Sequence, residues 1–123
     1  MKTILVIEDN PDNMDLLEEI LEDEGFELVK ATLAEDGIAL LKQTHVDVIV
    51  TDVSLPKMSG LEATQVIKAD DATKHIPILI LTAHAMKADR DTALASGCDD
   101  FLTKPIDEEK FVKTIHKLVT SDE

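Results

Sequence analysis

The sequence predicts a doubly wound (βα)₅ domain built on a five-stranded parallel sheet, and two observations support this prediction. Short aliphatic runs, rich in Ile and Val, alternate with amphipathic segments of helical length. Such runs are typical of strands that are buried on both faces, as in a parallel sheet. Five strands that each precede a helix, joined by right-handed crossovers, place helices on both faces of that sheet. The predicted strands contain residues 4–7, 28–31, 46–50, 78–81 and 101–102.

The first predicted helix follows the first strand, and both of its ends carry a signal. Asn10 is a good N-cap, and Pro11 after it suits the first helical position. Gly25 is expected to end this helix, because glycine readily adopts the left-handed conformation found after many helices. The side chains expected to face the core form one stripe at helical spacing: Met14, Leu17, Ile20 and Leu21.

Each of the other helices carries a signal for one of its ends. Ser or Thr followed three residues later by Glu is the capping-box spacing, which predicts a helix start. A glycine after an amphipathic segment predicts a helix end, and an aspartate before one predicts a start. These signals are Thr32 with Glu35, Ser59 with Glu62, Gly97, and Asp107 before the apolar face of Phe111, Ile115 and Leu118.

Length and composition predict one domain, residues 1–123, that works in the cytoplasm. Acidic residues outnumber basic residues 26 to 12, and the formal charge of −14 argues against a nucleic-acid partner. Cys98 is the single cysteine, so no internal disulfide can form and a reducing compartment is expected. No apolar run has the length of a membrane span or a signal peptide, so no membrane association is expected.

Polar side chains that can do chemistry follow four of the five predicted strands. They are Glu8 and Asp9 after the first strand, Asp52 after the third, Thr82 after the fourth and Lys104 after the fifth. In an open parallel sheet the site lies beyond the carboxyl ends of the strands. Each residue alone has a structural explanation, such as the preference for acids at a helix start. Such explanations do not account for polar residues at four strand ends at once. The sequence therefore predicts one site with three carboxylates, a hydroxyl and an ammonium group.

The residue types in this site predict phosphoryl chemistry with a divalent metal ion. Carboxylates packed together repel one another unless a cation neutralises them. Oxygen ligands favour Mg²⁺, which keeps several waters and bridges carboxylates and phosphate oxygens. Asp52 can then act as a nucleophile toward a phosphoryl group and form an aspartyl-phosphate. Lys104 and Thr82 are expected to contact the phosphoryl oxygens.

The motifs of this site resemble those of response-regulator receiver domains over essentially the whole chain. The matching motifs are Glu8 with Asp9, Asp52 in the segment DVSLPKMSG (residues 52–60), Thr82 with Ala83, and Lys104 with Pro105. The resemblance implies a flavodoxin-like fold with strand order 2-1-3-4-5. It is closest in type to the stand-alone, chemotaxis-regulator-like receivers. It also implies a switch of two-component or phosphorelay signalling, not an enzyme that acts on other substrates.

The resemblance further implies a phosphoacceptor, a metal site and partners. Asp52 corresponds to the phosphoacceptor, and the phosphoryl donor would be a histidine kinase or a histidine phosphotransfer protein. The metal would be Mg²⁺, for which Mn²⁺ can substitute. Its ligands would be the carboxylates of Glu8, Asp9 and Asp52 and the main-chain carbonyl of Ser54. The output would be onward phosphotransfer, or a downstream protein bound to the face of the fourth helix, fifth strand and fifth helix (residues 87–96 and 101–118).

Within the same resemblance, three residues correspond to the switch. Thr82 is the switch hydroxyl, Phe101 the switch aromatic and Lys104 the phosphate-sensing lysine, with a cis peptide bond expected before Pro105. Phe101 has no hydroxyl, which excludes a coupling through one. His84 follows Thr82 by two residues, where the family tunes the access of water to the phosphoryl group. An exposed loop histidine without a role is the alternative interpretation.

Other functions fit the sequence less well. A phosphatase of the haloacid-dehalogenase type needs a second acid two residues after its nucleophile, where this chain has Ser54. A dinucleotide-binding domain needs a glycine-rich turn after the first strand, and none is present. A phosphorylation-independent docking module is disfavoured, because such modules usually lack one or more site residues. A receiver cut from a larger hybrid kinase or regulator would look similar to a stand-alone one.

Overall fold

The computed structural model describes residues 2–83 and 87–121, without the side chains of residues 87–90 and 121. Strands and helices alternate strictly in this part of the chain, as predicted. No helix within it is long and apolar enough to cross a membrane. The elements are β1 (Thr3–Ile7), α1 (Pro11–Asp23), β2 (Glu27–Ala31), α2 (Ala34–Leu41), β3 (Val48–Asp52), α3 (Gly60–Ala69), β4 (Ile78–Thr82), α4 (Lys87–Ala95), β5 (Asp100–Thr103) and α5 (Glu108–Ser121).

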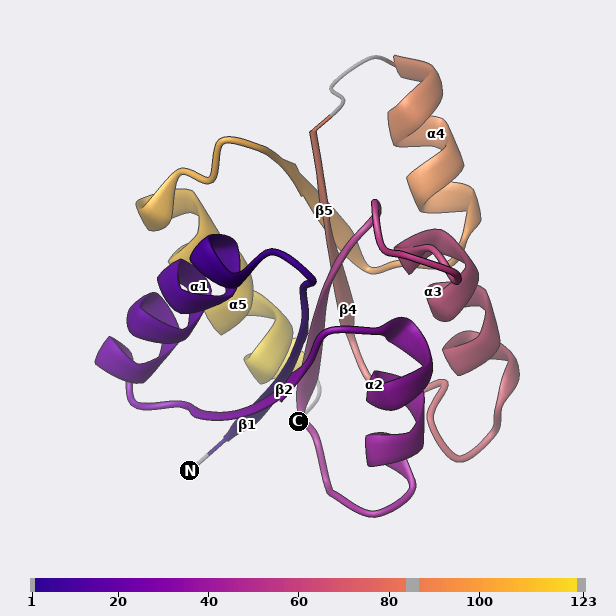
Figure 1. Cartoon of the computed structure of the whole chain (residues 1–123), viewed down its shortest axis with the longest axis horizontal. Helices are drawn as coiled ribbons and strands as arrows, with labels where there is room; N and C mark the ends of the chain where they lie inside the picture. Colours follow the sequence, from indigo (N-terminus) through magenta and orange to yellow (C-terminus); the bar gives the residue numbers. More distant parts are fainter. Residues whose placement is uncertain (1, 84–86, 122–123) are drawn as a thin grey trace.

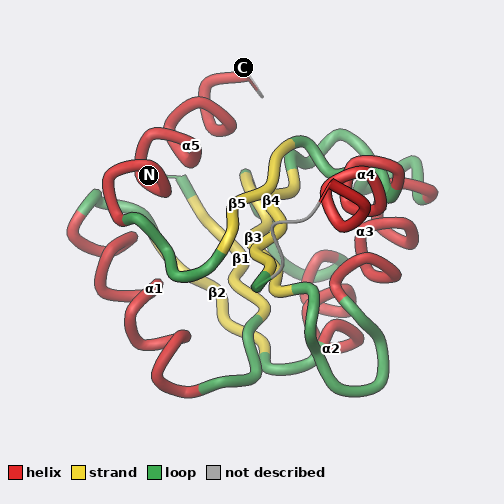
Figure 2. Tube along the Cα trace, turned by 90° about the horizontal axis from the view of Figure 1, so that it is seen from above, coloured by secondary structure: helices red, strands yellow, loops and turns green. Residues whose placement is uncertain are grey.

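The five strands form one sheet that lies between two layers of helices (Figure 1). The strand order is β2-β1-β3-β4-β5 and all four pairings are parallel, which confirms the predicted topology. Helices α1 and α5 cover one face of the sheet, and α2, α3 and α4 cover the other, as the view from above also shows (Figure 2). The order reverses between β1 and β3, so the point predicted for a site lies between these two strands.

Each face of the sheet has its own aliphatic core, because successive side chains of a strand point to opposite faces. On β1, Ile4 and Val6 pack in the core under α1 and α5, whereas Leu5 and Ile7 pack in the core on the α2–α3 side. The core under α1 and α5 also contains Phe111, a fully buried side chain of α5. The predicted inward stripe of α1 is confirmed, since Met14, Leu17, Ile20 and Leu21 are all buried.

Most of the predicted helix ends are confirmed. Asn10 caps α1 by accepting a hydrogen bond from the Asn13 N–H, and Pro11 is the first helical residue. Gly25 and Gly97 follow α1 and α4 with φ of 88° and 99°, in the left-handed region that favours glycine. The remaining confirmed caps are the Ser59–Glu62 capping box of α3 and Asp107, whose carboxylate accepts from the Lys110 N–H before α5.

Two local predictions are wrong. The capping box at Thr32 does not form, because α2 begins at Ala34 and its N-cap is Leu33, which makes no side-chain cap. Ala34 and Gly37 are buried at this start, and a Cβ at position 37 would lie 2.6 Å from the end of the Ile7 side chain, so the start is packed against β1. The third strand begins two residues later than the apolar run predicted and reaches Asp52.

Candidate functional site

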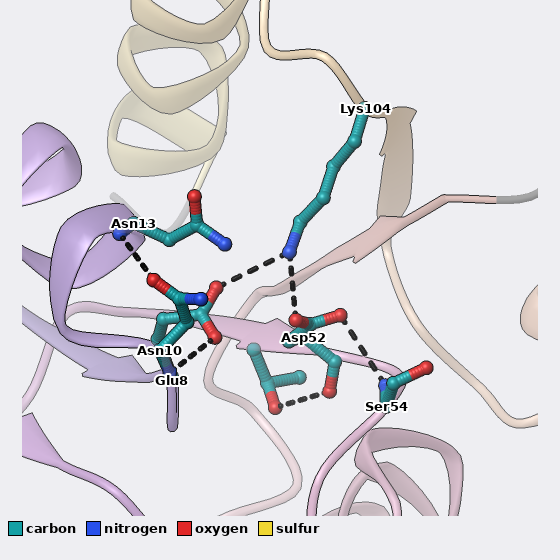
Figure 3. A network of polar contacts seen from close by, with 7 residues as sticks. Glu8, Asn10, Asn13, Asp52, Ser54 and Lys104 are labelled. Carbon is teal, nitrogen blue, oxygen red and sulfur yellow. Dashed lines mark hydrogen bonds and ion pairs between the residues drawn. The ribbon is translucent and has the colours of Figure 1, made fainter.

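The carboxyl ends of β1, β3 and β5 bring three predicted residues together, although they are far apart in the sequence (Figure 3). Glu8 follows β1, Asp52 is the last residue of β3, and Lys104 follows β5. The Lys104 side chain reaches across the end of the sheet, and its Nζ lies 2.7 Å from Asp52 Oδ2 and 3.2 Å from Glu8 Oε1. One ammonium group therefore bonds to both carboxylates.

The backbone and the charge of Lys104 are both held in place. Its N–H donates to the Thr82 carbonyl at 2.7 Å, and the peptide bond to Pro105 is cis, as the resemblance implied. Burial by itself would lower the pKa of the Lys104 ammonium. The hydrogen bond and the charge of Asp52, with those of Glu8, outweigh burial and raise this pKa above its ordinary value. Lys104 is therefore a fixed positive charge at neutral pH.

Glu8 is a buried acid whose negative charge is poorly compensated. Its side chain is 1 % exposed. Burial is the main cause that raises the pKa of Glu8 above its ordinary value, and the negative charge of Asp52 adds to this. The Asn10 N–H, at 3.1 Å from Oε2, and the Lys104 ammonium act in the opposite direction without cancelling it. A further cation at this position would favour the charged carboxylate.

Asp52 is also buried, and hydrogen bonds orient its carboxylate. Oδ1 accepts from the Ser54 N–H at 3.2 Å, while Oδ2 faces Lys104 (Figure 3). The Asp52 carbonyl accepts from the Thr51 hydroxyl at 3.1 Å. Both oxygens of the carboxylate therefore have a fixed direction before any ligand arrives.

Glu8, Asp9 and Asp52 form a group that fits a small divalent cation. One carboxylate oxygen from each lies within 4.8 Å of the other two, and Asp9 is exposed to solvent. Three carboxylates beside one ammonium group leave an excess of two negative charges. Oxygen ligands of this charge suit Mg²⁺, which binds through a few carboxylates and keeps several waters. The donor set is therefore consistent with the predicted metal.

Of the other predicted residues, three lie on or next to the strands that carry this group. Thr82 is buried at the end of β4, where it pairs with Thr103 of β5. Phe101 is half-buried on β5, opposite Ile80 of β4, so the two switch candidates lie on neighbouring strands as predicted. Ser54, whose carbonyl was predicted as a ligand, is exposed and lies two residues after Asp52. His84 lies outside the described residues.

A feature that the sequence did not suggest is a cavity of about 200 Å³ beside the carboxylates. It lies between α1 and the segment that follows β5. Glu8, Asn13 and Lys104 form its polar side, and Leu16 and Ile106 belong to its apolar side. Leu16 is 46 % exposed, in contrast to the buried apolar stripe of the same helix. The available signal in the sequence was Leu16 itself, an apolar residue of α1 outside its predicted inward stripe.

Comparisons with known proteins agree with this geometry. The family model of the response regulator receiver domain matches residues 4–116. The polar-differentiation response regulators DivK of Brucella ovis and Brucella abortus are 36 % identical over 114 residues, which is 93 % of this chain and of theirs.

Solved structures of receiver domains also resemble this chain. The receiver domain of a signal transduction histidine kinase from Syntrophus aciditrophicus is 28 % identical, with a TM-score of 0.93 and coverage of 98 % of this chain and 92 % of that one. The receiver domain of the sensor histidine kinase PA1611 from Pseudomonas aeruginosa, solved with a magnesium ion coordinated in its active-site cleft, is also 28 % identical. Its TM-score is 0.89, with coverage of 97 % of this chain and 98 % of that one.

Proposed function

Because this chain belongs to the response-regulator receiver domain family, we propose that it is phosphorylated on Asp52 by a histidine kinase or a histidine phosphotransfer protein. Receiver domains are the phosphoryl-accepting switches of two-component signalling, and this chain is one of them. The observation that supports Asp52 is its 2.7 Å contact with Lys104 Nζ, which also contacts Glu8. This contact places a fixed positive charge beside the buried carboxylate that ends β3.

The proposed step moves a phosphoryl group from a histidine nitrogen to an oxygen of Asp52. An electron pair of the carboxylate forms the new O–P bond while the N–P bond breaks. The bonding pair leaves with the imidazole, which is neutral when its other nitrogen carries a proton. Lys104 offsets the negative charge of the carboxylate and of the arriving phosphoryl oxygens, and the Ser54 N–H keeps the carboxylate oriented.

Mg²⁺ is the cofactor in this proposal, with Mn²⁺ as a substitute. The carboxylates of Glu8, Asp9 and Asp52 and the main-chain carbonyl of Ser54 would hold it. When bound, the metal would neutralise charge on the carboxylates and on phosphate oxygens. The proximity of the three carboxylates and the raised pKa of the buried Glu8 support this site, as does the magnesium ion in the solved PA1611 receiver.

The output in this proposal is a change in the surface formed by α4, β5 and α5. Phosphorylation draws the Thr82 hydroxyl toward the phosphoryl group, and Phe101 moves into the space that this leaves. Their positions on the adjacent strands β4 and β5 support the coupling. A downstream protein would read the altered surface, or the phosphoryl group would pass onward to a phosphotransfer histidine.

The rest of the proposal concerns the extent and setting of the protein. Residues 1–123 act as one domain that catalyses only its own phosphorylation and dephosphorylation. The single cysteine agrees with action in the cytoplasm, without a nucleic-acid or membrane partner. A phosphorylation-independent docking module is not favoured, because the acidic group and its lysine are intact.

Asp52→Asn tests the phosphoacceptor. The variant keeps the size of the side chain and an oxygen for the hydrogen bonds, but it has no nucleophilic carboxylate. Labelled acetyl phosphate with Mg²⁺ should add an acid-labile phosphoryl group to the wild type and none to the variant. Undiminished labelling of Asp52→Asn would show that another residue accepts the group.

Thr82→Ala tests the relay separately. Labelling by acetyl phosphate should remain close to that of the wild type, because Thr82 does not supply the nucleophile. The difference between phosphorylated and unphosphorylated protein in capturing a cognate partner should become smaller. An unchanged difference would reject Thr82 as the link to the surface.

A further inference from the structure

The first residue of α3, Gly60, lies directly against the backbone of the proposed phosphoacceptor. A Cβ at position 60 would lie 2.1 Å from the carbonyl oxygen of Asp52 and 2.9 Å from its carbonyl carbon. It would also lie 3.1 Å from Val53 Cα. These are backbone atoms at the end of a central strand, so they cannot rotate away as a side chain would. Only glycine fits between α3 and β3 here.

Hydrogen bonds hold the start of α3 in this position. The Gly60 N–H donates to the Val53 carbonyl at 3.0 Å, and the hydroxyl of the fully buried Thr64 donates to the Gly60 carbonyl at 2.8 Å. The capping box of Ser59 and Glu62 closes the same turn. The bond from Gly60 to Val53 therefore attaches the first turn of α3 to the segment after Asp52, and the other bonds stiffen that turn from within.

That segment carries the parts of the site that need accurate placement. Asp52 is held on one side by Lys104 and on the other by the Ser54 N–H, at 2.7 and 3.2 Å. The Val53 N–H donates to the Leu81 carbonyl at 3.0 Å, which fixes the segment to β4. A shift of the Asp52 backbone would move the carboxylate relative to Lys104, and a misplacement of about 1 Å can reduce a reaction rate about 100-fold.

We propose that Gly60 is a positioning residue for Asp52: the missing side chain lets α3 pack on the backbone of Asp52 and Val53 and so sets where the carboxylate lies. The inference rests on the proposed role of Asp52 as phosphoacceptor. Gly60 touches neither substrate nor metal in this proposal and acts only through the backbone.

Gly60→Ala, compared with Gly25→Ala, tests this role. Gly25 ends α1 with φ of 88°, and a Cβ there would meet no atom within 4 Å, so Gly25→Ala strains the backbone without touching the site. In Gly60→Ala the maximal rate of phosphorylation by acetyl phosphate, per folded molecule, should fall about 10- to 100-fold. The half-saturating concentration of acetyl phosphate should change much less. Gly25→Ala should lower the unfolding midpoint and keep the wild-type rate.

The Ser54 amide gives a second measurement that does not depend on phosphorylation. Its resonance in NMR spectra of the metal-free protein should shift in Gly60→Ala and not in Gly25→Ala, because it reports the bond to Asp52. A wild-type rate and an unshifted Ser54 amide in Gly60→Ala would overturn the proposal. Equal rate losses in both glycine variants would also overturn it, since the loss would then follow stability alone.

Two further outcomes keep the inference separate from the proposed function. If the wild type accepts no phosphoryl group, the proposed role of Asp52 as acceptor is wrong. The chemical shift of the Ser54 amide in Gly60→Ala then decides by itself whether Gly60 positions Asp52. If Gly60→Ala does not fold, Thr64→Val replaces it, because it removes only the hydroxyl bonded to the Gly60 carbonyl. A shifted Ser54 amide and a slower rate in Thr64→Val support the proposal, and wild-type behaviour in both overturns it.

Discussion

Acidic residues lie at both ends of the sheet, but their surroundings differ. At the amino end, Asp47 accepts a hydrogen bond from the Thr3 N–H at 2.8 Å. Asp99 accepts from the Ile78 N–H at 2.8 Å and from Lys68 Nζ at 2.9 Å. Burial alone would raise the pKa of Asp47, but the Thr3 N–H and the neighbouring imidazole outweigh it and lower this pKa. The charged form of Asp47 therefore stabilises the fold, and Asp99 supports it through its two hydrogen bonds.

At the carboxyl end, the carboxylates are placed together instead of apart. Glu8, Asp9 and Asp52 lie near one another, and burial raises the pKa of Glu8. A raised pKa means that the charged form of Glu8 costs free energy in the folded protein without a metal. The comparison teaches that acidic residues support the fold at the amino end of the sheet, whereas at the carboxyl end they form a group that fits a cation.

Removing the Glu8 charge should have the largest effect of the three changes. It should weaken the binding of Mg²⁺ and leave the stability of the metal-free protein intact. In Glu8→Gln the affinity for Mg²⁺ should fall about 10- to 100-fold, measured by calorimetric titration. Without metal, the free energy of unfolding at neutral pH should not fall, because the stability that Glu8 contributes is present at low pH and is lost as the pH rises through its raised pKa. A clear loss of stability in chelator would contradict the contrast between the two ends.

Removing the Asp99 carboxylate should give the converse result. Asp99→Ala leaves the N–H of the buried Ile78 without its acceptor, which should lower the free energy of unfolding by about 1–2 kcal/mol. Urea unfolding measures this loss. The Mg²⁺ affinity should remain that of the wild type, because Asp99 lies at the opposite end of the sheet from Asp52. A matching loss of Mg²⁺ affinity would mean that the two ends are coupled.

The smallest expected effect concerns pH and Asp47. Because its pKa is lowered, Asp47 contributes stability above the ordinary value of 3.8, and this is lost as the pH falls through the lower pKa of the folded protein. Asp47→Asn keeps an oxygen for the Thr3 N–H, so stability at neutral pH should fall by only about 0.5 kcal/mol.

The measurement is the free energy of unfolding between neutral pH and the acid range. It should depend less on pH in Asp47→Asn than in the wild type. Asp23→Asn, at the solvent-exposed end of α1, controls for the loss of one negative charge. An equal change in both variants would remove the special role of Asp47.

Some local predictions failed where packing between distant segments decided the outcome. Thr32 and Glu35 have the spacing of a capping box, but the close contact of Gly37 with Ile7 accompanies a helix start one residue later than the box requires. The buried Glu35 Oε1 has no hydrogen-bond partner among the described residues. Ser59 and Glu62 have the same spacing, and there the local signal and the packing of α3 agree.

The sequence by itself determined the alternation of strands and helices, most helix ends and the residue types at the strand ends. It could do so because apolar periodicity, caps and strand ends are properties of neighbouring residues. Only the tertiary structure decided that Lys104 lies 2.7 Å from Asp52, that Glu8 is buried with a raised pKa, and that α3 needs glycine at its first position. These features depend on contacts between segments up to 96 residues apart, which no local pattern contains.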